Sequence, residues 1–363
     1  MHDQRCAYVY IHCEGCNIPE EYLCMEYNYG LVFETQKSPK LIGISLVVII
    51  LLSYIVCSAL HLSTESWLVV FLNTFATTKP TDCSKGTDFT KRPSFNNNHL
   101  TLDLGSDGYL VPNIVHYIWY VDNRHDLSFI NMLAIISADR FLNPTAIYFY
   151  CNHKPKGPNW DRVMRKVPSL AVVHQRPVTC VYGTPITNPV FGPSSSDLER
   201  VTTLMDKGGI YLDLDVIVVR SFDPLRNHSC TVGLETRDKV NSGVLVCHRN
   251  SPFLRLWLEH YIADYKVWMW NYNAGWVPAY LAERYPEYIH LEPNRLQRPN
   301  GDEIDMIWGP ESFNWRDNYA VHLLVRTWRS KNLFMVEEPN MDYISRTNST
   351  FSQLARRIIL NQP

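Results

Sequence analysis

From about residue 109 onward, short apolar stretches alternate with longer stretches in which apolar residues recur every three or four positions. The short stretches are rich in β-branched and aromatic residues and predict strands, whereas the longer ones predict helices. The predicted strands are 113–119, 145–151 and 171–175, and the predicted helices are 126–142 and one around 159–166. Strands that alternate with helices are typical of an α/β fold with a mixed, mainly parallel sheet.

A further helix is predicted in PSSSDLERVTTLMDKGG, residues 193–209, because this stretch has both a start and a stop signal. Serines precede its first turn, acidic Asp197 favours the positive end of a helix, and Gly208-Gly209 favours its termination. Its apolar stripe consists of Leu198, Val201, Leu204 and Met205. Asp197 and Arg200 are three residues apart, so we expect them to share one face of this helix.

The apolar stretch after this helix, GGIYLDLDVIVV, contains two carboxylates. It is predicted to form one strand, in which Tyr211, Asp213 and Asp215 point to one side. An unpaired buried carboxylate costs several kcal/mol, and two close together cost more. The sequence therefore predicts a neighbouring cation, which is either an arginine such as Arg200 or Arg220, a lysine, or a metal ion.

Residues 41–60, LIGISLVVIILLSYIVCSAL, contain no charged side chain and are long enough to cross a bilayer. Lys37 and Lys40 stand just before this segment, whereas the next basic residue after it is Lys79, so the N-terminus is predicted to lie in the cytosol. Either Met1 or Met25 is the start of the chain. The predicted order is a cytoplasmic tail (1–40), a transmembrane anchor (41–60), a stem (61–108), a catalytic domain (109–330) and a C-terminal extension (331–363).

Composition adds further expectations about compartment and partners. The formal net charge of −2 gives no reason to expect a nucleic-acid partner. The sequons at Asn227 and Asn348 are candidate glycosylation sites and agree with a lumenal domain. Five cysteines follow the apolar segment, which allows at most two disulfides among them and leaves one cysteine over.

The combination of Ser-Asp-x-x-Arg with Gly-Gly-x-Tyr-x-Asp-x-Asp resembles the DXD region of one glycosyltransferase family. This family includes animal alpha-1,4-galactosyltransferases, alpha-1,4-N-acetylglucosaminyltransferases and fungal alpha-mannosyltransferases. The resemblance extends from about residue 114 to about 328. The other segments that carry it are NIVHYIW, NSGVLV, WGPESF and YAVHLLVRTW.

The resemblance implies a GT-A-like, Rossmann-type domain that binds a nucleotide-sugar donor, UDP-linked, together with a divalent metal, usually Mn²⁺. It implies transfer of a hexose or N-acetylhexosamine, with retention of configuration, to a glycolipid or glycoprotein glycan. A single-pass type II protein of the Golgi membrane with a lumenal catalytic domain is expected.

The resemblance also assigns roles to individual residues. Trp119 would stack on the base, Asp197 and Arg200 would contact sugar and ribose or phosphate, and Tyr211 would line the donor pocket. Asp213 would contact ribose, sugar or metal, Asp215 and His322 would ligate the metal, and Asn241 would lie near the anomeric centre. A buried core position for Trp119 and His322, and a turn for Asn241, are the alternative interpretations.

Two other functions remain open. A membrane protein of the same fold that binds sugar nucleotide without transferring the sugar would carry the same residues. A haloacid-dehalogenase-type phosphatase also places Asp-x-Asp after an apolar strand, but Gly-Thr usually follows there, whereas Val216-Ile217 follows here.

Overall fold

The structure, a computed structural model, divides the chain into two units, Met1–Thr78 and Lys79–Pro363. The described residues are 7–8, 24–25, 104–121, 125–181, 184–188, 192–193, 195–236, 238–266, 271–310, 312–331 and 338–360. In the first unit they form one antiparallel pair, β1 (Ala7–Tyr8) with β2 (Cys24–Met25). Most of the predicted tail, the whole membrane anchor and most of the stem lie outside the described residues. Among the residues that are described, no helix has both the length and the apolar character needed to cross a membrane.

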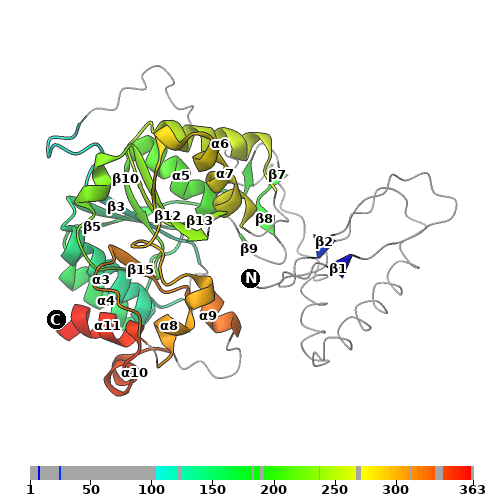
Figure 1. The fold of residues 1–363 in the computed structure, drawn as a ribbon. Coiled ribbons are helices and arrows are strands. Elements are labelled where there is room, and N and C mark those ends of the chain that lie inside the picture. Colours follow the sequence, from blue (N-terminus) through cyan, green and yellow to red (C-terminus); the bar gives the residue numbers. More distant parts are fainter. Residues whose placement is uncertain are drawn as a thin grey trace, which may run out of the picture. The chain divides into compact units, whose positions relative to one another are not determined.

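The second unit is built around a seven-stranded sheet with the order β14-β12-β13-β10-β3-β4-β5 (Figure 1). Within it, the two pairings of β13 are antiparallel and the other pairings are parallel. The mixed, mainly parallel sheet is thus confirmed. The strands are β3 (Ile114–Trp119), β4 (Ala146–Cys151), β5 (Leu170–His174), β10 (Gly209–Leu212), β12 (Cys230–Thr236), β13 (Lys239–Cys247) and β14 (His290–Glu292).

Shorter pairings lie outside this sheet. They are β6 (Cys180–Val181) with β7 (Thr184–Pro185), β8 (Thr187–Asn188) with β9 (Gly192–Pro193), and β11 (Val216–Val218) with β15 (Ala320–His322), each of them antiparallel. Of these, the β11–β15 pair matters most for the candidate site, because it joins the Asp-x-Asp segment to a part of the chain about a hundred residues further on.

Helices cover both faces of the sheet. In Figure 1, α5, α6 and α7 lie together on one side, and α3, α4 and α11 lie on the other. The longer helices are α3 (Phe129–Leu142), α4 (Gly157–Lys166), α5 (Ser195–Lys207), α6 (Pro252–Ala263), α7 (Val277–Arg284) and α11 (Thr350–Leu360). The shorter ones are η2 (Asp223–Asn227), η3 (Tyr272–Trp276), η4 (Pro286–Tyr288), η5 (Gly301–Glu303), α8 (Asp305–Trp308), α9 (Val325–Lys331) and α10 (Met341–Arg346).

Each face of the sheet has its own apolar core, because alternate residues of a strand point to opposite sides. Tyr117 and Trp119 of β3 belong to the core that contains Leu133 of α3. Ile118, between them, belongs to the core that contains Leu204 of α5. The strands are therefore buried on both sides, as in other mainly parallel sheets.

The predicted strands agree with the observed β3, β4 and β5 to within one residue at either end. The predicted helix 126–142 begins later, at Phe129, because the Ser128 hydroxyl accepts a hydrogen bond from the Asn131 backbone N–H at 3.1 Å and caps the helix. The helix that was predicted from the stretch 193–209 is confirmed as α5.

Gly208 and Gly209 connect α5 to β10 with backbone φ angles of 66° and 115°, a region that favours glycine. A Cβ atom at Gly209 would lie 2.5 Å from the Ile114 carbonyl oxygen on the neighbouring strand. The glycine pair thus allows the helix to reverse directly into the centre of the sheet, which places the Asp-x-Asp segment at the carboxyl end of β10.

The prediction of one continuous strand through Asp215 is wrong. β10 ends at Leu212, the next three residues form a turn, and β11 then leaves the main sheet. The Asp213 N–H donates to the Gly243 carbonyl at 2.8 Å and the Val216 N–H donates to the Asp213 carbonyl at 3.0 Å, and these two bonds fix the turn. Asp213 and Asp215 are therefore half-buried at the edge of the core and do not alternate on a strand.

A disulfide joins Cys230 of β12 to Cys247 of β13, where the two residues are directly paired in the sheet. Cys180 is also disulfide-bonded, and Cys151 is a buried free thiol.

Candidate functional site

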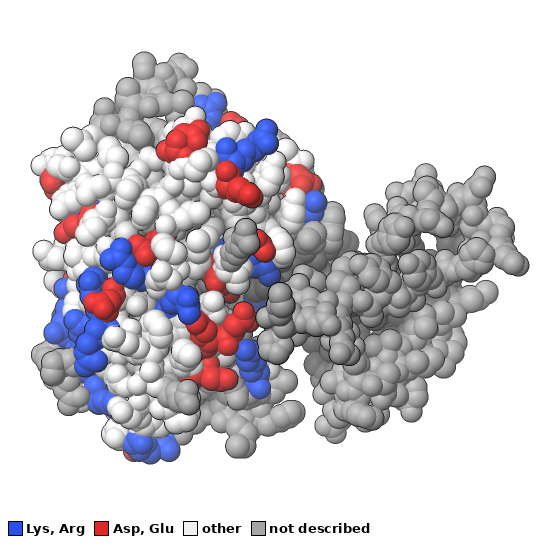
Figure 2. Space-filling view, viewed as in Figure 1, with Lys and Arg blue, Asp and Glu red and all other residues white. Residues whose placement is uncertain are grey.

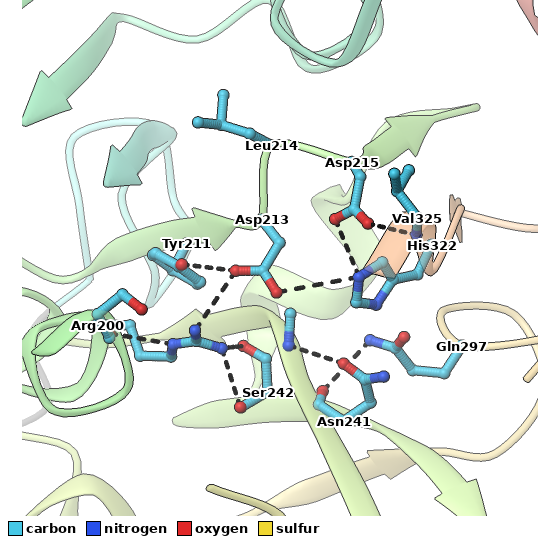
Figure 3. A network of polar contacts seen from close by, with 12 residues as sticks. Arg200, Tyr211, Asp213, Leu214, Asp215, Asn241, Ser242, Gln297, His322 and Val325 are labelled. Atoms are coloured by element: carbon cyan, nitrogen blue, oxygen red, sulfur yellow. Dashed lines mark hydrogen bonds and ion pairs between the residues drawn. The ribbon is translucent and has the colours of Figure 1, made fainter. Parts of the chain in front are cut away.

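Asp213, Asp215 and His322 converge at one point, and one ligand atom of each lies within 4.8 Å of the others (Figure 3). The His322 Nε2 atom lies 3.1 Å from Asp215 Oδ1 and 3.9 Å from Asp213 Oδ2. In the part of the chain that the structure describes, this is the one group of histidine and acidic side chains with the spacing of a metal site.

The pairing of β11 with β15 brings His322 to the two aspartates. Val216, the residue after Asp215, stands opposite His322 in this pair. The Leu323 N–H donates to the Asp215 carbonyl at 2.9 Å, and the Val325 N–H donates to Asp215 Oδ2 at 3.0 Å. One oxygen of the Asp215 carboxylate is thus held by the start of α9, and the other faces His322.

Asp213 faces a second set of groups on the opposite side. The Tyr211 hydroxyl donates to Asp213 Oδ1 at 2.6 Å, and Arg200 Nη2 lies 3.4 Å from the same oxygen. Arg200 Nη2 also pairs with Asp197 Oδ1 at 2.9 Å. The predicted shared face of Asp197 and Arg200 is therefore observed, and the cation beside Asp213 is Arg200. Arg220 instead pairs with Asp317 at 3.3 Å.

Arg200 is only 6% exposed and is fixed from several directions. Its Nη1 donates to both the carbonyl and the hydroxyl oxygen of Ser242 at 2.9 Å, and its guanidinium lies over the Tyr211 ring, 4.7 Å from the centroid. Burial acts to lower the pKa of Arg200, but Asp213, Tyr211 and Asp197 raise it above its usual value. The site therefore contains a fixed, permanently charged guanidinium.

Asn241 and Gly243 of β13 form the floor beneath Asp213 and His322. The Gly243 N–H donates to Asn241 Oδ1 at 2.9 Å, which orients the Asn241 amide. A Cβ atom at position 243 would lie 2.6 Å from His322 Cε1 and 2.9 Å from Asp213 Oδ2. The aspartate and the histidine can thus converge because residue 243 has no side chain.

The electrostatics of this group suit a cation. Burial acts to lower the pKa of His322, but the neighbouring Asp215 and Asp213 raise it above its usual value. Burial likewise acts to raise the pKa of Asp215, but the pairing with His322 and the hydrogen bond from the Val325 N–H lower it. Two carboxylates and one imidazole form a donor set that fits a divalent ion such as Mn²⁺.

Several predicted residues lie apart from this group. Trp119 is 9% exposed and packs in the core, with its ring centroid 6.3 Å from that of Phe149, so its stacking on a nucleotide base stays a prediction. Asn227, at the end of η2, and Asn348, before α11, are both exposed, as a glycosylated asparagine must be.

Three further residues of the site were not predicted from the sequence: Ser242, which holds Arg200; Gly243, which makes room for the aspartate and histidine; and Gln297, which donates to the Asn241 carbonyl at 3.3 Å. The neighbourhood of Asn241 within NSGVLV could have indicated the first two. Gln297 is far from any motif, and only the fold places it at the site.

Comparisons with known proteins find similarity in the part of the chain that contains the Asp-x-Asp segment. Residues 147–232 match the family described as "Glycosyltransferase sugar-binding region containing DXD motif". The chain is 26% identical over 273 residues to glucan organizing enzyme 1 of Cryptococcus neoformans, a match that covers 69% of this chain and 72% of that protein. It is 38% identical over 82 residues to mouse lactosylceramide 4-alpha-galactosyltransferase, covering 23% and 22% of the two chains.

Solved structures show a more distant likeness. The glycosyltransferase GlyE of Streptococcus pneumoniae is 11% identical, with a TM-score of 0.39 over 69% of this chain and 64% of that one. The galactosyltransferase LgtC is 13% identical, with a TM-score of 0.33 over 67% and 95%.

Proposed function

Since the chain belongs to the glycosyltransferases whose sugar-binding region contains a DXD motif, we propose that it transfers a hexose or N-acetylhexosamine from a UDP-linked sugar. The acceptor is a glycan on a glycolipid or glycoprotein, and the catalytic domain is GT-A-like. The observation that carries this proposal is the convergence of Asp213, Asp215 and His322 beside the buried Arg200. A phosphatase of the haloacid-dehalogenase type is not supported, because the matched family is a glycosyltransferase family.

Different residues of the site would bind different parts of the donor. Asp213, Asp215 and His322 would hold a divalent metal, which when bound neutralises the charge that develops on the departing diphosphate. Asp197 accepts hydrogen bonds from sugar hydroxyls, and Arg200 donates to sugar or phosphate oxygens. Because Arg200 is already fixed by Ser242, it needs little reorganisation when the donor binds.

Retention of the anomeric configuration is part of the proposal. Both aspartates of the cluster are already engaged, Asp213 by Tyr211 and Arg200, and Asp215 by His322 and the Val325 N–H. Neither is therefore free to act as a base toward the acceptor. We propose that a phosphate oxygen of the leaving diphosphate accepts the proton of the acceptor hydroxyl, on the same face of the sugar from which the diphosphate departs.

We also propose that residues 41–60 anchor the chain in the Golgi membrane with the catalytic domain in the lumen. The Cys230–Cys247 disulfide supports an oxidising compartment. The exposed positions of Asn227 and Asn348 agree with it. On the face seen in Figure 2, acidic side chains gather in the middle of the lower half and basic ones along the lower left edge. The formal net charge of −2 favours a sugar acceptor over a nucleic acid.

The test is a donor screen on the purified full chain in detergent. UDP-galactose, UDP-N-acetylglucosamine and UDP-N-acetylgalactosamine are each incubated with Mn²⁺ or with a chelator, and released UDP is measured. We expect turnover of one donor that needs the metal and is lost in Asp215→Asn, with the fold retained by circular dichroism. Asp206→Asn, at an exposed position on α5, is the matched control and stays active. A wild-type chain that binds UDP-sugar without turnover would instead support the non-catalytic alternative.

A further inference from the structure

Gln297 stands in the loop after β14 and is only 2% exposed. Its aliphatic stem packs on Gly233 of β12, where a Cβ atom would lie 2.2 Å from Gln297 Cγ. The strand register also shifts at this point, between Val232 and Gly233. The glycine and the shift together make room for a buried glutamine beside the floor of the site.

The orientation of the Gln297 amide is set by Asn241. Gln297 Nε2 donates to the Asn241 backbone carbonyl at 3.3 Å, and the reverse orientation would place two oxygen atoms against each other. Gln297 Oε1 is then buried without a hydrogen-bond partner. In Figure 3, Gln297 lies on the side of Asn241 away from Arg200. Since buried acceptors are nearly always paired, this oxygen indicates a donor group that arrives with a ligand.

The polar residues around Gln297 indicate which class of ligand supplies this donor group. Asp197 and Arg200, on one side of the Asp213–His322 group, and Gln297 with Asn241, on the other, are polar groups of the kinds that bind sugar hydroxyls. The one feature that Gln297 adds is a neutral acceptor, which a hydroxyl group of a sugar satisfies and a phosphate oxygen does not.

We propose that Gln297 Oε1 accepts a hydrogen bond from one hydroxyl group of the transferred sugar, and so is a specificity-determining residue of this site. The inference rests on the proposed function and deepens it. Gln297 rejects a sugar that lacks this hydroxyl, because the acceptor oxygen then remains buried and unpaired.

The test compares two proteins, with and without the Gln297 amide, on donors with and without each sugar hydroxyl. The wild-type full chain and Gln297→Met, which keeps the length of the side chain without its amide, are measured with the natural UDP-sugar and with the series of donors that lack one hydroxyl each. Donor affinity by calorimetry and UDP release are both recorded. We expect the wild type to lose about 5- to 150-fold with one deoxy donor, the range that an unpaired buried acceptor gives. Gln297→Met loses a similar factor with the natural donor and then no longer distinguishes the two.

Two variants separate this role from general damage to the fold. Gly233→Ala displaces the Gln297 side chain, because the added Cβ atom would lie 2.2 Å from Gln297 Cγ. We therefore expect this variant to discriminate less between the natural donor and the deoxy donor. Gln353→Met removes a glutamine amide on α11 that binds the Trp315 indole N–H, and leaves donor discrimination unchanged.

Mn²⁺ affinity without donor provides the last readout, because Gln297 binds the Asn241 carbonyl in the same strand as Gly243, which packs against His322, so a purely structural role of Gln297 would alter the metal site as well. The inference requires equal Mn²⁺ affinity in the wild type and Gln297→Met. A loss of metal affinity in the variant, or equal discrimination of all deoxy donors by both proteins, overturns it. A wild-type chain that neither binds nor turns over any UDP-sugar refutes the proposed function itself.

Discussion

Replacing Gly243 with alanine tests whether the close approach of Asp213 and His322 is what binds the metal. The added Cβ atom would lie 2.6 Å from His322 Cε1 and 2.9 Å from both His322 Nδ1 and Asp213 Oδ2, whereas ordinary contacts are 3.4–4 Å. The ring must therefore move by about 1 Å to reach a normal separation. The backbone itself accepts alanine, because Gly243 does not adopt a positive φ.

The expected magnitude follows from this displacement. Overpacking of this kind costs about 1–3 kcal/mol of stability, which leaves the protein folded. A shift of about 1 Å in a catalytic group lowers turnover by about 100-fold. Misplacing a metal ligand weakens metal affinity by about 10- to 100-fold, as removal of a supporting residue does.

The assay is calorimetric titration of Mn²⁺ into the purified full chain, followed by UDP release and thermal unfolding. Gly301→Ala is the matched control, because its Cβ would meet only Glu235 Oε1, at an ordinary 3.5 Å. We expect the control to resemble the wild type in all three measurements. If Gly243→Ala stays folded and binds Mn²⁺ within about twofold of the wild type, the three side chains are not the metal ligands, and the reasoning from their convergence fails.

Three further predictions concern pH, the disulfide and the anchor. Because Asp215 raises the pKa of His322 above its usual value, the stabilisation from protonated His322 in the metal-free chain is present below the unfolded pKa of about 6.5 and is lost as pH rises through the folded pKa. Mn²⁺ binding must displace that proton, so its affinity should rise with pH over the same window, measured by calorimetry in two buffers; a flat profile would argue against His322 as a ligand. Replacing Cys230 and Cys247 by alanine, at a sequence separation of 17, should cost about 3 kcal/mol and lower the unfolding temperature, and an unchanged temperature would contradict this. Deleting residues 1–60 behind a secretion signal should yield a soluble, active protein, and a product that stays with the membrane fraction would show that the anchor is elsewhere.

The parts of the fold that depend on local pattern could be predicted from the sequence. The strands β3, β4 and β5 and the helix α5 follow from apolar spacing, capping and the glycine pair, all of which act over a few residues. Asp197 and Arg200 were likewise placed on one helix face by their spacing, and the structure joins them at 2.9 Å.

The parts that depend on chain topology could not be predicted. Asp215 lies on a turn and not on a strand, because β10 ends at Leu212 and the next strand pairs with β15. No local spacing records that pairing, or the position of Gln297 beside Asn241. The family resemblance supplied His322 as a candidate ligand, whereas Ser242, Gly243 and Gln297 were found only from their contacts.

The pairing of β11 with β15 has a consequence for how this protein matures. The sequence motif is complete once Asp215 has been synthesised, yet His322 follows 107 residues later. A nascent or truncated chain that stops before β15 therefore contains the whole motif and lacks the third proposed ligand. Under the proposed function, affinity for a divalent metal would therefore appear only once β15 has folded against β11, and a fragment chosen by its motif alone would lack one of the three proposed ligands.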